Sequence, residues 1–252
     1  MNELETQIAR LWEITETQIL QRERFYGNLL AFLEGSEFYT GEDVSLCTCT
    51  GPGDLYRLLL GKGDKVYGND GSRAMLKILE KRMKTLQHWE KPTNLRWQDL
   101  PKHYPSSHFD FEWTEGNSLI YTNSWAQRHP DLSKARAEIE KSIAGIAAVL
   151  KKGGRWYVDL PKETEISGSH RIRLNAENRE IDFMYSLLND WDQKVRTFVM
   201  EESYPGYKLR VTQKAFLITG EELRKMCVPI HFSKIEKLEV GDPHYQGYLL
   251  TK

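Results

Sequence analysis

The spacing of apolar residues changes along the chain and divides it into four stretches. Over the first forty residues the apolar side chains recur at helical intervals, and Gly35 is a plausible stop. This pattern predicts an N-terminal arm of one or two helices at residues 1–40. The positions that carry the helical spacing are Trp12, Ile19, Tyr26, Leu29, Leu30 and Leu33.

From residue 41 short apolar runs alternate with amphipathic stretches. We expect strands at residues 44–49, 65–68, 94–97, 109–113 and 155–160, separated by helices at 54–61, 72–83 and 132–150. Ser72 is the expected cap of the second of these helices, and the segment 151–154 is expected to close the third. Strands that alternate with helices predict an α/β fold with a doubly wound, Rossmann-like, mostly parallel sheet.

After residue 160 the pattern changes to strands with little helix between them, at 181–185, 195–201 and 208–216. We interpret residues 161–217 as antiparallel cap strands over the ligand edge of the sheet, where a substrate would be covered. A helix from Thr219 and strands at 235–240 and 245–250 then close the chain. The expected organisation is one domain, 1–252, with a helical arm (1–40), a cofactor-binding core (41–160), a substrate cap (161–217) and a closing segment (218–252).

Charge and composition exclude several classes of protein. The 252 residues hold 35 Lys and Arg against 36 Asp and Glu, a net charge of −1, which argues against nucleic acid as a partner. No apolar run reaches the ~18 residues of a membrane span, and the polar, acidic start does not resemble a secretion signal. Three cysteines do not suggest a disulfide framework, so we expect a cytoplasmic protein without a membrane partner.

A glycine turn and an acidic residue carry the chemistry. The segment Thr50-Gly51-Pro52-Gly53 follows the first strand, and Asp70 follows the second, 19 positions after Gly51. Glycines allow close approach of a ligand, and an acid about 20 residues on can accept the hydroxyl groups of a ribose. A dinucleotide site would need a third glycine and would place Asp54 against the pyrophosphate, so an S-adenosylmethionine-like ligand fits better. An ordinary strand–helix turn remains the alternative.

Several segments in the right order resemble the class I S-adenosylmethionine-dependent methyltransferases, and most of all the glycine and glycine/sarcosine N-methyltransferase group. The resemblance covers about residues 12–165 and returns near the C-terminus. The segments are Val66-Tyr67-Gly68-Asn69-Asp70-Gly71-Ser72 with Met75, Glu115-Gly116-Asn117-Ser118-Leu119, the stretch from Val149 through Gly153-Gly154 to Asp159, Asp242-Pro243-His244-Tyr245, and the spaced residues Trp12, Arg22, Tyr26 and Leu30.

The resemblance implies S-adenosyl-L-methionine as cofactor, S-adenosyl-L-homocysteine as product, and a small-molecule acceptor. Asp70 would hold the ribose, Gly51 and Gly53 would approach the amino-acid part, and Arg22 would pair with the carboxylate. Met75 and Trp97 would lie near the adenine, although a Met at this spacing can equally belong to the core. The full set of implied cofactor-binding residues is Trp12, Arg22, Tyr26, Thr50, Gly51, Gly53, Asp70, Gly71, Met75, Arg96, Trp97, Gln98 and Glu115.

Asn117 and Tyr121 are the implied catalytic residues, and Asn117 would face the acceptor or the methionine moiety. A buried Asn that caps a turn is the alternative. No metal site is expected, because Cys47 and Cys49 have no partner ligands at metal-binding spacing.

The departures from the family pattern bear on the acceptor. Cys47 stands where the first strand usually ends in an acid, and Arg96 stands where an Asn or Asp usually precedes Trp97. The Arg that grips the substrate carboxylate in the glycine enzymes is missing, since Asp159 is followed by Leu160 and Pro161. Glycine is therefore doubtful as the acceptor, while the cofactor is less affected.

Three hypotheses follow. The first is in-line transfer of a methyl group to a small-molecule acceptor, with nitrogen favoured because no general base is identifiable from the sequence. The second is an enzyme in which the cofactor's own amine attacks its chain and releases methylthioadenosine, and the third is a non-catalytic nucleoside-binding scaffold. A homo-oligomer could form if the N-terminal arm exchanges between subunits.

Overall fold

The protein is built on a six-stranded sheet in the order β2-β1-β3-β4-β10-β9. The computed structural model describes residues 3–20, 22–84, 89–127, 129–164, 167–176, 179–240 and 244–252. β1 to β4 run parallel, and β10 pairs antiparallel with both β4 and β9. This confirms the predicted Rossmann-like, mostly parallel α/β fold. The strands are β1 (Ser45–Cys47), β2 (Val66–Gly68), β3 (Phe109–Thr114), β4 (Leu150–Pro161), β9 (Lys234–Leu238) and β10 (Tyr245–Thr251).

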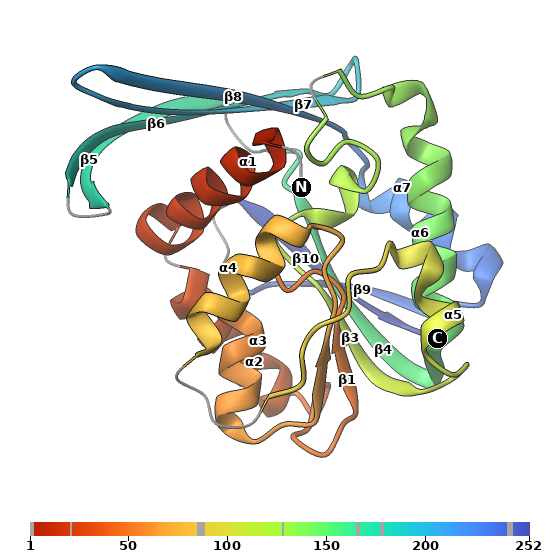
Figure 1. Cartoon of the computed structure of the whole chain (residues 1–252). Coiled ribbons are helices and arrows are strands. Elements are labelled where there is room, and N and C mark those ends of the chain that lie inside the picture. The colour runs from red at the N-terminus through yellow and green to blue at the C-terminus, as the bar shows by residue number, and fades with distance from the viewer. Residues whose placement is uncertain are drawn as a thin grey trace.

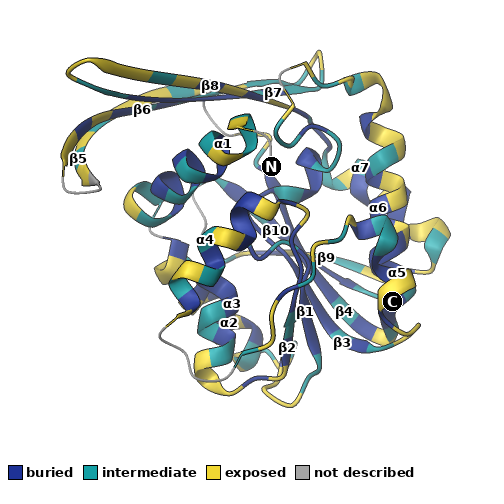
Figure 2. Cartoon of the chain, viewed as in Figure 1, coloured by how far each residue is buried: buried dark blue, intermediate teal, exposed yellow. Residues whose placement is uncertain are grey.

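Helices cover both faces of this sheet (Figure 1). One face packs on α2 (Arg22–Gly35), α3 (Asp54–Lys62) and α4 (Arg73–Met83). The other packs on α5 (Leu100–His103), α6 (Ala135–Val149) and α7 (Gly220–Cys227). Because each strand lies between two apolar layers, β1, β3 and most of β4 are buried, as the dark blue sheet in Figure 2 shows.

Local signals set several element boundaries correctly. The Ser72 hydroxyl accepts from the Met75 backbone N–H, as expected of a cap. Thr219 and Glu222 form a reciprocal capping box at the start of α7. α2 ends at the predicted Gly35.

The strand predicted at 94–97 is wrong. This part of the chain holds a single bridge between Asn69 and Thr93 and then the 3₁₀ helix η2 (Trp97–Asp99). The Trp97 indole donates to the Thr48 carbonyl at 2.7 Å, so the segment is held to the sheet by side chains in place of a ladder. The segment 151–154 was expected to close a helix, but it belongs to β4, where the Gly153 N–H donates to the Lys252 carbonyl.

The cap is a separate antiparallel sheet, as the sequence predicted, but it has four strands in the order β5-β6-β7-β8 where three were expected. Its strands are β5 (Gly168–Ala176), β6 (Arg179–Asp190), β7 (Val195–Tyr204) and β8 (Tyr207–Phe216). Strand β5 was not predicted, because it is an edge strand whose exposed His170, Arg171 and Arg173 hide the apolar alternation. The sheet extends beyond the core over the N-terminal helix (Figure 1).

The arm consists of α1 (Glu3–Ile14), a π-helical turn η1 (Thr15–Leu20) and α2. α1 lies between α4 and the cap sheet, and its apolar side packs on both. A bidentate ion pair from Arg10 to Glu202 fixes it to β7. Short 3₁₀ helices η3 (Ser118–Tyr121), η4 (Leu132–Lys134) and η5 (Val228–Ile230) complete the elements. In the described part of the chain, no helix is both long and apolar enough to cross a membrane.

Candidate functional site

The main cavity lies where β1, β2 and β3 end. Its wall is formed by the turns that follow these strands, by η1 and by the segment before α5. Because β1 is joined through α3 to β2 on one side while β3 lies on its other side, this is the switch point of the sheet, the usual place for a ligand. The described lining residues are Trp12, Glu16, Cys49, Gly51, Asp70, Gly71, Ser72, Met75, Leu95, Arg96, Trp97, Gln98, Glu115, Gly116, Ser118, Tyr121, Thr122, Asn123, Trp125, Gln127 and Ser142.

This lining includes most of the residues singled out from the sequence. Five of those residues are outside it: Arg22, Tyr26, Thr50, Gly53 and Asn117. The lining also includes residues that the sequence did not single out as catalytic or cofactor-binding, among them Glu16, Cys49, Gly116 and Trp125.

Asp70 joins the two turns after β1 and β2. Its carboxylate accepts from the Gly51 N–H and from the Ser72 N–H, both at 2.8 Å. Burial raises the pKa of Asp70 to about 6, although both backbone hydrogen bonds oppose the shift. A carboxylate has about four lone-pair sites, so two remain for a ligand in the cavity.

The two glycines of the first turn differ in what requires them. Gly51 has a positive φ of 49° and faces the cavity. At Gly53 (φ 96°), a Cβ would come within 2.2 Å of Leu79 Cδ1 in α4. Gly53 is therefore needed for the close packing of α3 on α4, and Gly51 for the shape of the cavity wall.

One wall of the cavity is formed by residues 95–98. Asn69 holds this segment: its amide donates to the Thr48 and Leu95 carbonyls and its Oδ1 accepts from the Leu95 N–H. Trp97 is buried and hydrogen-bonded to Thr48, while the Arg96 side chain is exposed. Met75 of α4 also lines the cavity and packs in the apolar cluster formed with α1. The lining thus combines apolar side chains with polar groups in this part of the cavity.

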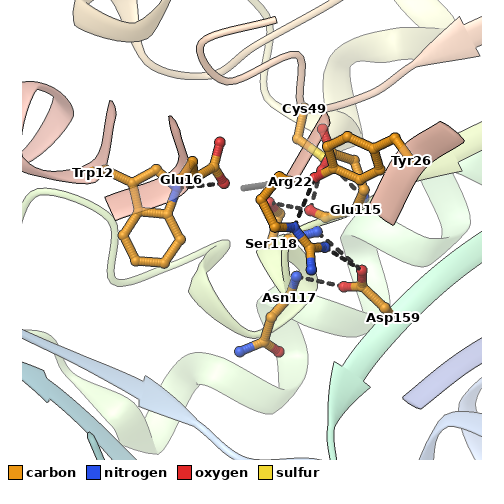
Figure 3. A network of polar contacts seen from close by, with 10 residues as sticks. Trp12, Glu16, Arg22, Tyr26, Cys49, Glu115, Asn117, Ser118 and Asp159 are labelled. Atoms are coloured by element: carbon orange, nitrogen blue, oxygen red, sulfur yellow. Dashed lines mark hydrogen bonds and ion pairs between the residues drawn. The ribbon is translucent and has the colours of Figure 1, made fainter. Parts of the chain in front are cut away.

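Asp159 of β4 holds the turn after β3 through backbone hydrogen bonds. The carboxylate of Asp159 accepts from the backbone N–H groups of Gly116 and Asn117. Arg22 lies 3.5 Å from the same carboxylate, and its Nε donates to the Tyr26 hydroxyl at 3.3 Å (Figure 3). Arg22 is only 3% exposed and is also stacked against aromatic rings of Phe25, Tyr26 and Tyr245.

Asn117 has a left-handed backbone (φ 62°) and is almost fully buried. Its side-chain amide has no hydrogen-bond partner among the described residues, and in Figure 3 it points away from Arg22 and Glu115. Tyr121, the other residue predicted to be catalytic, lines the cavity and is in edge contact with Trp12 and Trp125.

The arm contributes Trp12 and Glu16 to the cavity. The Trp12 indole N–H donates to Glu16 Oε1 at 2.8 Å, across one helical turn. Burial raises the pKa of Glu16 to about 7, and the nearby Asp54 raises it further, whereas Arg22 lowers it. The sequence analysis identified no such carboxyl. The signal that could have found it is its spacing, four residues after Trp12, on the same helical face.

Cys49 connects the turns after β1 and β3. Its thiol lies 3.4 Å from the Glu115 carbonyl and accepts from the Glu115 N–H at 3.3 Å. Burial raises the pKa of Cys49 to about 12, so the thiol is a packing and hydrogen-bonding group and not a nucleophile. All three cysteines of the chain are free.

A smaller cavity lies between the arm and the cap sheet, and Trp12 lines both cavities. Most of its wall is aromatic or basic, from Tyr185, Phe198 and Arg196 of the cap and from Tyr245 of β10. Arg196 is buried, whereas four other arginines of the cap strands are exposed: Arg171, Arg173, Arg179 and Arg210. Of the familial segment at 242–245, residues 242 and 243 lie outside the described residues.

Comparison with known proteins identifies the fold. No protein-family model matches the chain, and no curated protein matches it in sequence. Among solved structures it is similar to the sugar N-methyltransferase KedS8 from Streptoalloteichus (16% identity, TM-score 0.71, 96% of this chain and 92% of that one). It is also similar to DesVI from Streptomyces venezuelae (16%, 0.69, 95% and 97%). A third similar structure is the S-adenosylmethionine-bound amino pentose methyltransferase CalS10 from Micromonospora echinaspora (13%, 0.65, 92% and 94%). These likenesses show that the chain shares the fold of class I methyltransferases over nearly its whole length.

Proposed function

We propose that the protein transfers a methyl group from S-adenosylmethionine to an amine of a small-molecule acceptor. One observation carries the proposal: the carboxylate of Asp70, at the end of β2, borders the cavity while it holds the Gly51 turn at the end of β1. An acid in this position can accept the two hydroxyl groups of a ribose. The fold shared with structures described as S-adenosylmethionine-dependent methyltransferases supports the same ligand.

The cavity offers a place for each part of this cofactor. We assign the ribose to Asp70, the adenine to the pocket between Met75 and the 95–98 segment, and the amino-acid part to the turns at Gly51 and Gly116. Arg22 pairs with Asp159, which holds the Gly116 turn, and Arg22 is not among the described residues that line the cavity. Methyl transfer from a sulfonium needs alignment above all, which such fixed turns supply.

We assign the acceptor to the side of the cavity where Trp12, Tyr121 and Trp125 meet. Trp12 separates this side from the smaller cavity under the cap, so an acceptor would be covered by cap residues such as Phe198, 5.2 Å from the Trp12 ring. An amino sugar is the first acceptor class to test, because two similar structures are described as sugar and amino pentose methyltransferases. Glycine is disfavoured, because Leu160 and Pro161 stand where the glycine enzymes carry an Arg.

Product analysis by mass tests the proposal. The protein is incubated with S-adenosylmethionine and a panel of amino sugars, glycine and sarcosine. The proposal expects S-adenosylhomocysteine together with an acceptor one methylene heavier, lost in Asp70→Ala and kept in Asp64→Ala. Asp64 is a buried aspartate that bonds Tyr39 and does not line the cavity, so it controls for a general loss of fold. Methylthioadenosine without a methylated acceptor would instead support an intramolecular reaction of the cofactor.

A further inference from the structure

Two carboxyl groups in the main cavity take no part in the assignment of the ribose, the adenine and the amino-acid part. Glu16 comes from the π-helical turn of the arm and Glu115 from the turn after β3, and both line the cavity. Both are more than nine-tenths buried. Glu16 accepts one hydrogen bond, from Trp12, while the Glu115 carboxyl has no hydrogen-bond partner among the residues that the structure describes. Buried carboxyls that border a cavity and form no ion pair with another described residue favour a positively charged ligand.

The position of Glu16 is fixed between two glycine turns. A Cβ at Gly51 would lie 3.8 Å from Glu16 Oε2, and a Cβ at Gly116 would lie 3.5 Å from Glu16 Oε1. Both glycines have positive φ. The Glu16 carboxyl therefore lies close to the turns after β1 and β3, where a ligand group held between these turns would meet it. Figure 3 shows the hydrogen bond from Trp12 to this carboxyl.

The charges around the pair do not neutralise it. The cations that face it are Arg22 and Arg82, and the other acids are Asp54 and Asp159. Arg22 is paired with Asp159, and Arg82 with Asp54. Burial raises the pKa of Glu115 well above its usual range, and the charge of Glu16 raises it further, while Arg22 opposes both. The two arginines that face the pair are thus both paired with other acids, and a cation bound in the cavity would favour the ionised forms of Glu16 and Glu115.

We propose that Glu16 and Glu115 form a paired-carboxyl subsite for an organic cation, namely the positively charged cofactor S-adenosylmethionine. This inference rests on the proposed function and explains how the site would prefer S-adenosylmethionine to S-adenosylhomocysteine. S-adenosylmethionine carries ammonium, sulfonium and carboxylate groups and a net charge of +1, whereas S-adenosylhomocysteine lacks the sulfonium charge. Within the described ranges no set of three metal-ligating side chains forms, which favours an organic cation over a metal ion.

The consequence is a preference for the substrate form of the cofactor over its product. Ionised carboxylates in a buried site attract the sulfonium but gain nothing from the neutral thioether. Binding of the cation also lowers the pKa values of Glu16 and Glu115, because it favours their ionised forms. Each carboxyl that ionises releases one proton to the solvent. Because methyl transfer removes the sulfonium charge, the product S-adenosylhomocysteine is bound more weakly.

Calorimetric titration of the whole chain with each ligand at pH 7.5 tests the inference. The variants are Glu16→Gln and Glu115→Gln, and the matched control is Glu112→Gln. Glu112 lies three residues before Glu115, is equally buried in β3 and is not among the described residues that line the cavity. We expect the wild type and Glu112→Gln to bind S-adenosylmethionine about tenfold more tightly than S-adenosylhomocysteine, the size of one buried charge contact. In the two cavity variants this preference falls below about threefold.

Repeating the titration in two buffers of different ionisation enthalpy measures the protons released. We expect release with the wild type and Glu112→Gln, and less with either cavity variant. Equal affinities for both ligands in all four proteins, or binding without proton release, would overturn the inference while leaving the proposed function standing. Slower turnover of Glu16→Gln at unchanged affinities would also overturn it, because Glu16 would then act in proton transfer. No binding of either ligand by the wild type would remove both proposals together.

Discussion

The guanidinium of Arg22 lies 3.5 Å from the carboxylate of Asp159, and this buried ion pair joins the N-terminal arm to the end of β4. Asp159 in turn accepts the backbone N–H groups of Gly116 and Asn117. The arm is therefore coupled through one ion pair to the turn that forms a wall of the cavity. Any change at Arg22 acts on both folding and the site.

Replacing Arg22 by Met leaves the Asp159 carboxylate buried without its counter-charge. We expect the free energy of unfolding to fall by about 3–5 kcal/mol, as for other broken buried pairs. Urea denaturation of Arg22→Met, Asp159→Asn and the double variant measures this. The double variant should lose clearly less than the two single losses added together. Additive losses would show that the pair is not coupled.

The same variant can separate positioning from direct cofactor contact. Decarboxylated S-adenosylmethionine lacks the carboxylate that the sequence resemblance assigned to Arg22. If Arg22 clamps this carboxylate, Arg22→Met should weaken binding of the full cofactor far more than binding of the decarboxylated one. An equal loss for both ligands would leave Arg22 only the role of holding Asp159 and its turn.

Glu112 should make the protein less stable as the pH rises. It is fully buried in β3, neither carboxyl oxygen has a hydrogen-bond partner, and burial raises its pKa well above the usual range. Between the unfolded pKa and the raised folded pKa, the folded state keeps the proton while the unfolded chain releases it, so stability is lost as the pH rises above about 4.5. We expect Glu112→Gln to be more stable than the wild type by about 1–3 kcal/mol at pH 7.5.

Other carboxyls with raised pKa values, such as Asp70, act in the same direction, so the difference between the two proteins is what isolates Glu112. Denaturant melts between pH 4.5 and 7.5 should show this difference shrinking toward zero at the acid end. A difference that stays constant with pH, or changes sign, would contradict a raised pKa of the buried Glu112.

Gly145 of α6 lies against the cavity wall formed by residues 95–98, at Trp97. A Cβ at Gly145 would come within 2.1 Å of the Trp97 carbonyl oxygen, which belongs to the backbone and cannot easily move. We expect Gly145→Ala to destabilise the fold by about 1–3 kcal/mol and to weaken cofactor binding. Gly61→Ala in α3 is the control, because nothing lies within 4 Å of its Cβ and it should stabilise the helix by about 0.5–1 kcal/mol. Thermal melts of both variants check this, and equal effects would refute it.

The sequence was sufficient for the sheet, the arm and the antiparallel cap, because each depends on a local period of apolar residues. It failed at residues 94–97, where Trp97 is held by a hydrogen bond to Thr48 across 49 positions, a contact that no local pattern encodes. It also failed at β5, whose exposed edge lacks apolar alternation. At the site, Asp70 and Gly51 could be paired by spacing, but Glu16 could not be placed. Its carboxyl reaches the cavity only because α1 packs between α4 and the cap.

The most direct test of the central claim is calorimetric titration of the wild type and Asp70→Ala with S-adenosylmethionine. A nucleoside site at Asp70 requires binding in the micromolar range by the wild type. We expect a loss of about 100-fold or more in Asp70→Ala, because two charge-assisted hydrogen bonds to the ribose disappear. Asp64→Ala should bind like the wild type. No binding by the wild type, or equal binding by Asp70→Ala, would contradict a nucleoside site at the ends of β1 and β2.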